Sequence, residues 1–163
     1  MTDLINYEKN GFTENRKVCL TYSAGGHYAE LLKAIDGLNF TNTYHVTFKS
    51  GRFSNDDSCE RYYLTHPQKK VGRTLLNAIQ SFYILLKKRP KIIISTGADV
   101  TVSTLILGKL FFRCKVIFIE SAGDLKPTLT GRLVYKFSDI FIVQWPEKLK
   151  FFPKAILSEG ILL

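Results

Sequence analysis

The chain has 163 residues, of which 45% are hydrophobic and 23% are charged, and it carries a formal net charge of +9. This length and hydrophobic content predict one folded domain with an ordinary core and exclude an intrinsically disordered chain. There is no uncharged run of about 18 apolar residues, so we expect no transmembrane helix. Residues 1–16 are polar and lack the apolar region of a signal peptide, and we expect an N-terminal extension followed by a single domain over 17–163.

The cysteines and the positive charge restrict the possible partners. Cys19, Cys59 and Cys114 form no CxxC pair and have no histidine at metal-ligand spacing, so we expect reduced thiols, no metal site and no cofactor. Most of the positive charge follows residue 68, which indicates a nucleic acid, an anionic membrane, a phosphate-bearing substrate or only a solvated basic surface. Because no helix-turn-helix, RNP or zinc motif occurs, we do not expect a nucleic-acid partner.

Strand and helix patterns alternate along the chain. Strands are predicted at 17–22, 43–49, 60–65, 91–95, 115–120, 139–144 and 154–158, and helices at 28–37, 71–88, 98–112, 128–137 and 146–152. The continuous apolar runs at 92–94, 116–119 and 140–143 are typical of parallel strands that are buried on both faces. The predicted fold is therefore α/β, with a Rossmann-like, doubly wound and mainly parallel sheet.

The first strand is followed by the most distinctive turn, Ser23-Ala24-Gly25-Gly26-His27. Glycines allow a ligand to approach the backbone, and the first N–H groups of the next helix favour an anion such as phosphate. The turn does not match G-x-G-x-x-G, because Ala29 stands where the third glycine would fall, and no acidic residue ends the second strand. We therefore expect a phosphate site but no dinucleotide, or else a tight turn of purely structural importance.

Two further turns follow the fourth and fifth large strands, at Ser95–Asp99 and Glu120–Asp124. The carboxyl ends of parallel strands meet at one edge of a sheet, so we expect the three turns to form one site. The expected catalytic residues are His27 and Glu120, and the expected phosphate- or acceptor-binding residues are Ser23, Gly25, Gly26, Thr96, Gly97, Ala98, Asp99 and Ser121. The structural alternatives are that His27 holds its loop and that Glu120 caps a helix.

The predicted helix 71–88 has a wide apolar stripe between two basic clusters. The stripe comprises Val71, Leu75, Ile79, Phe82 and Leu86, broadened by Leu76, Tyr83 and Leu85. The basic clusters are Lys69, Lys70 and Arg73 before it, and Lys87, Lys88 and Arg89 after it. An apolar helix with basic ends suits an anionic membrane surface, although a helix packed in the core with a basic C-terminus gives the same pattern. Both interpretations are compatible if one edge of the helix is buried and the other faces solvent.

Four segments together resemble one protein family. They are Ser-Ala-Gly-Gly-His at 23–27, Ser-Thr-Gly-Ala-Asp at 95–99, Ile-Phe-Ile-Glu-Ser at 117–121 with Leu-Thr-Gly-Arg-Leu at 129–133, and Asp-Ile-Phe-Ile-Val-Gln-Trp-Pro at 139–146. The set resembles the acceptor-side subunit of split GT-B glycosyltransferases, the Alg-type oligosaccharide biosynthesis family that includes PssD-like proteins of bacterial exopolysaccharide and capsule assembly. More distantly, the turns resemble those of the amino-terminal half of MurG, the peptidoglycan N-acetylglucosaminyltransferase.

The resemblance implies a GT-B half-domain that binds the acceptor, while a separate subunit supplies the donor site. It implies inverting transfer from a UDP-sugar to a polyprenyl-diphosphate-linked saccharide, peripherally at the cytoplasmic face of the cell membrane, with no activity before the partner joins. His27 is then the expected general base, and Glu120 is its rival or orients the acceptor sugar. The alternatives are a non-catalytic scaffold that recruits a complete transferase to the membrane, and a stand-alone nucleotide-binding enzyme.

Overall fold

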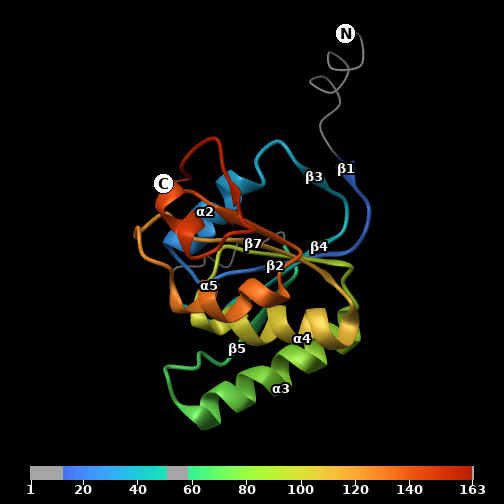
Figure 1. The fold of residues 1–163 in the computed structure, drawn as a ribbon. Coiled ribbons are helices and arrows are strands. Elements are labelled where there is room, and N and C mark those ends of the chain that lie inside the picture. Colours follow the sequence, from blue (N-terminus) through green and yellow to red (C-terminus); the bar gives the residue numbers. More distant parts are fainter. Residues whose placement is uncertain (1–12, 51–58, 163) are drawn as a thin grey trace.

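The computed structural model describes residues 13–50 and 59–162, which fold around a seven-stranded sheet (Figure 1). The strands are β2 (Val18–Thr21), β4 (Thr43–Phe48), β5 (Arg61–Leu64), β6 (Ile92–Ser95), β7 (Lys115–Ile119), β8 (Ile140–Val143) and β9 (Ile156–Leu157). They lie in the order β5-β4-β2-β6-β7-β8-β9, and every neighbouring pair is parallel. The prediction of a doubly wound parallel sheet is therefore confirmed.

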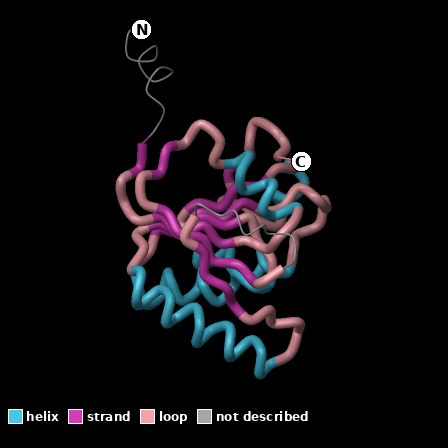
Figure 2. Tube along the Cα trace, turned by 180° about the vertical axis from the view of Figure 1, so that it is seen from behind, coloured by secondary structure: helices cyan, strands magenta, loops and turns pink. Residues whose placement is uncertain are grey.

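Helices cover both faces of this sheet. On one face lie α3 (Val71–Lys88), α4 (Val102–Phe112) and α5 (Leu129–Val134), and on the other lies α2 (Gly26–Ala34), as Figure 1 and the opposite view in Figure 2 show. Successive side chains of a strand enter two cores: Cys19 and Ile93 pack toward the side of α4, whereas Leu20 and Ile94 pack toward the side of α2. This burial on both faces explains the continuous apolar runs.

The chain reverses its direction across the sheet between β2 and β6. From β2 it proceeds to β4 and β5 on one side, and α3 returns it to β6, after which β7, β8 and β9 follow on the other side. The register pairs Thr21 with Ser95, so β2 and β6 end at the same level. Ligands of open parallel sheets bind where the strand order reverses in this way. The glycine turns after β2 and β6 therefore lie where a ligand site is expected.

The predicted elements differ from the structure mainly at short helices. The predicted helix 98–112 divides into a 3-10 turn, η1 (Asp99–Thr101), and α4, and the predicted helix 128–137 divides into α5 and η2 (Tyr135–Phe137). The predicted helix 146–152 is only the 3-10 segment η3 (Pro146–Lys150). It begins at Pro146 and is followed by Pro153, and a proline disfavours the helical conformation of the residue before it.

A small parallel pair of strands has no counterpart in the sequence prediction. β1 (Thr13–Glu14) pairs with β3 (Asn39–Phe40), and each has two residues, too few to give a periodic pattern. β1 falls within the predicted 1–16 extension, and its Glu14 is buried and accepts hydrogen bonds from Arg16. At least this part of the extension therefore packs on the domain.

Candidate functional site

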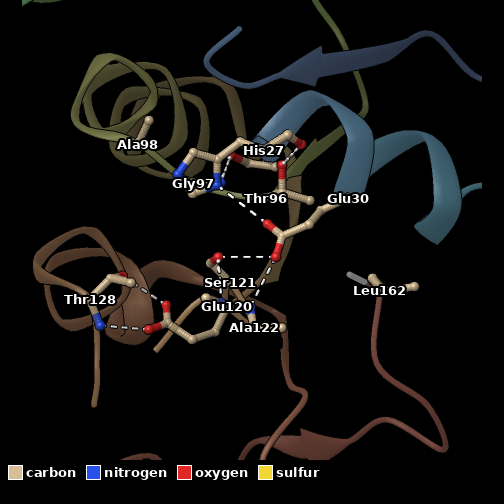
Figure 3. A network of polar contacts seen from close by, with 12 residues as sticks. His27, Glu30, Thr96, Gly97, Ala98, Glu120, Ser121, Ala122, Thr128 and Leu162 are labelled. Atoms are coloured by element: carbon tan, nitrogen blue, oxygen red, sulfur yellow. Dashed lines mark hydrogen bonds and ion pairs between the residues drawn. The ribbon is translucent and has the colours of Figure 1, made fainter. Parts of the chain in front are cut away.

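Three turns meet at the carboxyl edge of the sheet and are joined by hydrogen bonds (Figure 3). The turn after β6 contacts the turn after β2, because Thr96 Oγ1 donates to the backbone oxygen of His27 at 2.5 Å. Helix α2 contacts the turn after β7, because Glu30 Oε1 accepts hydrogen bonds from Ala122 N at 2.9 Å and from Ser121 Oγ at 3.0 Å. Three separate stretches of sequence are therefore held as one unit.

The backbone of these turns adopts conformations that favour glycine. Gly25 and Gly97 have φ values of 101° and 107°. Ala98 has φ 84° and ψ 152°, a region that stores about 1–3 kcal/mol of strain in a residue with a side chain. Thr101 holds this conformation, because its N and Oγ1 donate to Ala98 O at 3.1 and 2.8 Å. Strain of this kind is concentrated at functional sites.

The backbone amides of the two turns differ in what they offer a ligand. Gly26 and His27 begin α2, and the amides and dipole of a helix N-terminus favour an anion. The amide of Gly97 already donates to Ser95 Oγ at 3.0 Å. The expectation that Gly97 N–H holds a phosphate is therefore not supported by the geometry, because that donor is used within the turn. The N-terminus of α2 fits an anion better.

His27 lies between the turns, in a fixed position that a ligand can reach. Its ring packs against Gly97, where an added Cβ would lie 3.6 Å from His27 Cε1. The His27 side chain is 28% exposed, whereas its Nδ1 atom is buried and lies 3.5 Å from Glu30 Oε2. The ring therefore presents Nδ1 to the interior, while part of the side chain remains exposed.

Glu30 is a site residue that sequence reasoning missed. It is only 2% exposed, although it lies on α2 three residues after His27. Burial by itself raises the pKa of its carboxyl, but the contact with His27 and the hydrogen bonds from Ala122 and Ser121 outweigh this effect and hold the pKa below the ordinary value. The His-x-x-Glu spacing, which puts both side chains on one helix face, is the sequence signal that was overlooked.

Glu120, the expected rival base, is inaccessible. It is 0% exposed, its Oε1 accepts from Thr128 N at 2.6 Å and its Oε2 accepts from Thr128 Oγ1 at 2.9 Å. Lys148, also 0% exposed, pairs with Oε1 at 3.3 Å and donates to Ser121 O at 2.6 Å. A Cβ on Gly131 would overlap with the Glu120 carboxylate, so α5 covers it closely. This geometry supports the alternative interpretation, in which Glu120 holds the start of α5 through its N-cap, Thr128.

The remaining predicted site residues lie around this centre. Ser23 is half-buried at the end of β2, and Asp99 Oδ1 lies 3.5 Å from His66 Nε2. His45 is buried, and its Nδ1 is hydrogen-bonded to Tyr22 Oη at 2.8 Å. Within residues 13–50 and 59–162, no group of three or more His, Cys, Asp or Glu side chains is placed to bind a metal ion together.

Helix α3 exposes its apolar stripe and buries polar residues instead. Of its side chains, Asn77, Ser81, Ile84 and Leu85 are buried. Exposed fractions of 39–87% are found for Val71, Leu75, Leu76, Ile79, Phe82, Tyr83 and Leu86. Of the eight residues of the predicted stripe, Leu85 is buried in the core and these seven are exposed. The alternative of a stripe packed in the core is therefore wrong for these seven residues. None of the helices in the described part of the chain is long and apolar enough to cross a bilayer.

Hydrogen bonds explain why the polar side of α3 faces inward. Asn77 Nδ2 donates to Thr65 O at 2.9 Å and to Val100 O at 3.2 Å, and Ser81 Oγ is hydrogen-bonded to Thr104 Oγ1 at 3.0 Å. These bonds join α3 to the end of β5, to η1 and to α4. The Nδ2 group of Asn77 and the Ser81 hydroxyl are satisfied in this way, which favours one orientation of the helix.

The basic residues at the ends of α3 are not equivalent. Lys69, Lys70, Arg73, Lys87 and Arg89 are exposed. Lys88 instead pairs with Glu60, lies 5.2 Å from the centroid of the Tyr62 ring and keeps only 17% of its side chain exposed. The expectation that Lys88 belongs to a membrane-facing cluster is therefore wrong, because it packs against β5.

Comparisons with known proteins agree with this fold. The family described as "Oligosaccharide biosynthesis protein Alg14 like" matches residues 18–162. The "UDP-N-acetylglucosamine transferase subunit ALG14" of Rattus norvegicus is 27% identical over 82% of this chain and 77% of its own length. The "UDP-N-acetylglucosamine--N-acetylmuramyl-(pentapeptide) pyrophosphoryl-undecaprenol N-acetylglucosamine transferase" of Borreliella afzelii is 32% identical over 61% of this chain and 27% of its own length.

Solved structures share the architecture at low sequence identity. MurG of Acinetobacter baumannii superposes with a TM-score of 0.65 at 12% identity, over 90% of this chain and 44% of its own. A UDP-N-acetylglucosamine 2-epimerase of Rickettsia bellii gives a TM-score of 0.66 at 11% identity, over 86% of this chain and 42% of its own. The chain therefore corresponds to less than half of these larger proteins. Since the family match covers nearly the whole described domain, this chain belongs to the Alg14-like family of oligosaccharide biosynthesis proteins.

Proposed function

We propose that this chain is the acceptor-binding subunit of a two-component inverting glycosyltransferase. It transfers a sugar from a UDP-sugar to a polyprenyl-diphosphate-linked saccharide, and we place it in bacterial exopolysaccharide or capsule assembly. The observation that carries the proposal is the position of His27. This partly exposed imidazole lies at the N-terminus of α2, beside the strained turn after β6 and at the point where the strand order reverses.

The chemistry assigned to His27 is general-base catalysis. The acceptor hydroxyl loses its proton to the imidazole while its oxygen forms a bond to the anomeric carbon of the donor sugar. The bond from that carbon to the UDP oxygen breaks, and UDP leaves with the electron pair. The amides of Gly26 and His27 at the start of α2 suit the diphosphate of the acceptor. Glu120 takes no part in the proton transfer, because its carboxylate is enclosed by Thr128 and Lys148.

A second subunit supplies the donor site in this proposal. The finding that supports it is that relatives such as the Rattus norvegicus protein, of which this chain covers 77%, are themselves named transferase subunits. The complex therefore places the UDP-sugar opposite the edge that carries His27, and chemistry occurs between the two chains.

The exposed face of α3 is the proposed membrane contact. Its apolar side chains are available to lipid, and Lys69, Lys70, Arg73, Lys87 and Arg89 at its two ends suit anionic headgroups. The protein then lies peripherally at the cytoplasmic face of the cell membrane, where a polyprenyl-linked acceptor is held with its polar end near the surface.

The test is turnover by the chain, with and without a donor-binding subunit encoded beside it. We expect no transfer to a lipid-linked acceptor by the chain alone and transfer by the complex. His27→Ala in the complex lowers kcat about 10²–10⁴-fold, the usual contribution of a general base. His66→Ala, at the same sheet edge, is the matched control and retains activity. A His27→Ala complex with wild-type kcat reduces this subunit to a scaffold that recruits the transferase.

A further inference from the structure

Two buried polar atoms face each other beside the proposed base. His27 Nδ1 and Glu30 Oε2 are both enclosed, and neither forms a hydrogen bond of ordinary length with any described residue. The two atoms lie 3.5 Å apart. Buried polar atoms are rarely left without a partner. A slight tightening of this contact gives each atom the partner that it lacks.

The Glu30 carboxylate is held rigidly on its other side. Its Oε1 accepts from Ala122 N and from Ser121 Oγ, so the turn after β7 fixes the carboxylate while Oε2 points at the imidazole (Figure 3). The contact with His27, together with these two hydrogen bonds, holds the pKa of Glu30 below its ordinary value against the effect of burial, so Glu30 is ionised at neutral pH. A charged acceptor therefore lies permanently behind the ring.

We infer that Glu30 is the positioning residue of His27: its carboxylate holds the ring proton on Nδ1 and leaves Nε2 to accept the proton of the acceptor hydroxyl. Once that proton moves to Nε2, the buried negative charge stabilises the imidazolium. This is the physical logic by which a carboxylate orients a histidine in catalytic triads. The inference rests on the proposed function, because it takes His27 as the base.

Glu30 is the ionised group in contact with the ring. On its other side, the His27 ring packs against Gly97 of the turn after β6, which is uncharged backbone. The turn after β7 contributes Ser121 and Ala122, which are uncharged and bind Glu30. The alternative is that Glu30 only connects α2 to the turn after β7. These two roles differ in their effect on the His27 ring.

The experiment uses Glu30→Gln, which separates the charge from the connection. The amide oxygen still accepts from Ala122 N and Ser121 Oγ, while the amide NH₂ now faces His27 Nδ1 and donates to it. The ring proton must then move to Nε2, where it blocks proton uptake. Trp145→Phe is the matched control, because Trp145 Nε1 donates to Ala122 O at 2.8 Å and its removal loosens the same turn without touching Glu30.

The first readout is the tautomer of His27 in the isolated chain, measured from the ¹⁵N shifts of its ring at a pH where it is neutral. We expect the Nδ1–H form in the wild type and in Trp145→Phe, and the Nε2–H form in Glu30→Gln. The second readout is the complex with the donor-binding subunit, where Glu30→Gln lowers kcat about 10²-fold or more with little change in KM for the acceptor. Trp145→Phe leaves kcat within about threefold of the wild type.

The two readouts distinguish the possible failures. An unchanged His27 tautomer in Glu30→Gln overturns the inference, even if His27→Ala is inactive and the proposed function stands. A Trp145→Phe variant as slow as Glu30→Gln also overturns it, because loosening the turn is then sufficient. A switched tautomer together with full activity of His27→Ala overturns the proposed function while the His27–Glu30 pair itself stands.

Discussion

Replacing Glu120 with glutamine tests whether this carboxylate is structural. The Glu120 side chain accepts three hydrogen bonds, from Thr128 N, Thr128 Oγ1 and Lys148 Nζ, and both members of its ion pair are 0% exposed. Glutamine keeps one acceptor oxygen, but it leaves the Lys148 ammonium buried without an opposite charge. Removing one partner of a buried pair costs about 3–5 kcal/mol, a large fraction of the roughly 5–15 kcal/mol by which a domain is stable.

The measurement is the free energy of unfolding in urea, for the isolated chain, followed by circular dichroism. We expect Glu120→Gln to be less stable by about 3–5 kcal/mol, and the double variant Glu120→Gln with Lys148→Met to recover part of that loss because no unpaired charge remains. Near wild-type stability in Glu120→Gln, within about 1 kcal/mol, together with a large loss of kcat in the complex, would refute this reasoning and restore Glu120 as a candidate base.

Three further predictions concern strain, pH and lipid. Ala98→Gly relieves about 1–3 kcal/mol of backbone strain, but the greater freedom of glycine in the unfolded chain costs about 0.4–1 kcal/mol of stability. We therefore expect the free energy of unfolding in urea to rise by about 1 kcal/mol, and any destabilisation contradicts the strain. Glu30 is buried and Asp139 is partly desolvated, which raises the pKa of each carboxyl, but the contact of Glu30 with His27 and the hydrogen bond from Lys109 to Asp139 lower the pKa of each below the ordinary value. The stabilisation from these two carboxylates is therefore complete above the unfolded pKa of about 4, and it is lost as the pH falls below that value. Urea unfolding midpoints at pH 7, 5 and 3 measure this loss, and Asp139→Asn should make the midpoint depend less on pH. The double variant Leu75→Ser with Ile79→Ser should bind anionic vesicles more weakly by about tenfold or more, and added salt should weaken the binding further. Leu32→Ser on α2 is the control and should bind like the wild type. Equal binding by the wild type, the double variant and the control excludes α3 as the lipid contact.

The strand pattern and the turns could be predicted because they depend on local sequence. Continuous apolar runs such as 92–94 have no stable place except a strand that is covered on both faces. Parallel strands joined by helices bring their carboxyl ends to one edge, so the meeting of Ser23–His27 with Ser95–Asp99 followed from the element order. The strain at Ala98 had no such signal, because alanine rarely adopts its conformation.

Only the tertiary structure decided what surrounds each functional side chain. Glu30 on α2 and Glu120 after β7 are both carboxylates at the edge where the turns meet, yet one faces His27 while the other is enclosed by Thr128 and Lys148, from segments 8 and 28 residues further along the chain. The role of Glu120 depends on Thr128 and Lys148, and the hold on Glu30 depends on Ser121 and Ala122, contacts that a local pattern does not contain.

The sequence by itself determined the Rossmann-like sheet, the edge where its turns meet and the amphipathic nature of helix α3. Periodicity shows that a helix has an apolar face, but not which face its neighbours cover. In α3 the polar Asn77 and Ser81 are buried, because Thr65 O, Val100 O and Thr104 Oγ1 offer them partners, and the apolar stripe is left at the surface. The orientation of α3 and the pairing of Glu30 with His27 both depend on hydrogen-bond partners that only the folded chain brings within reach.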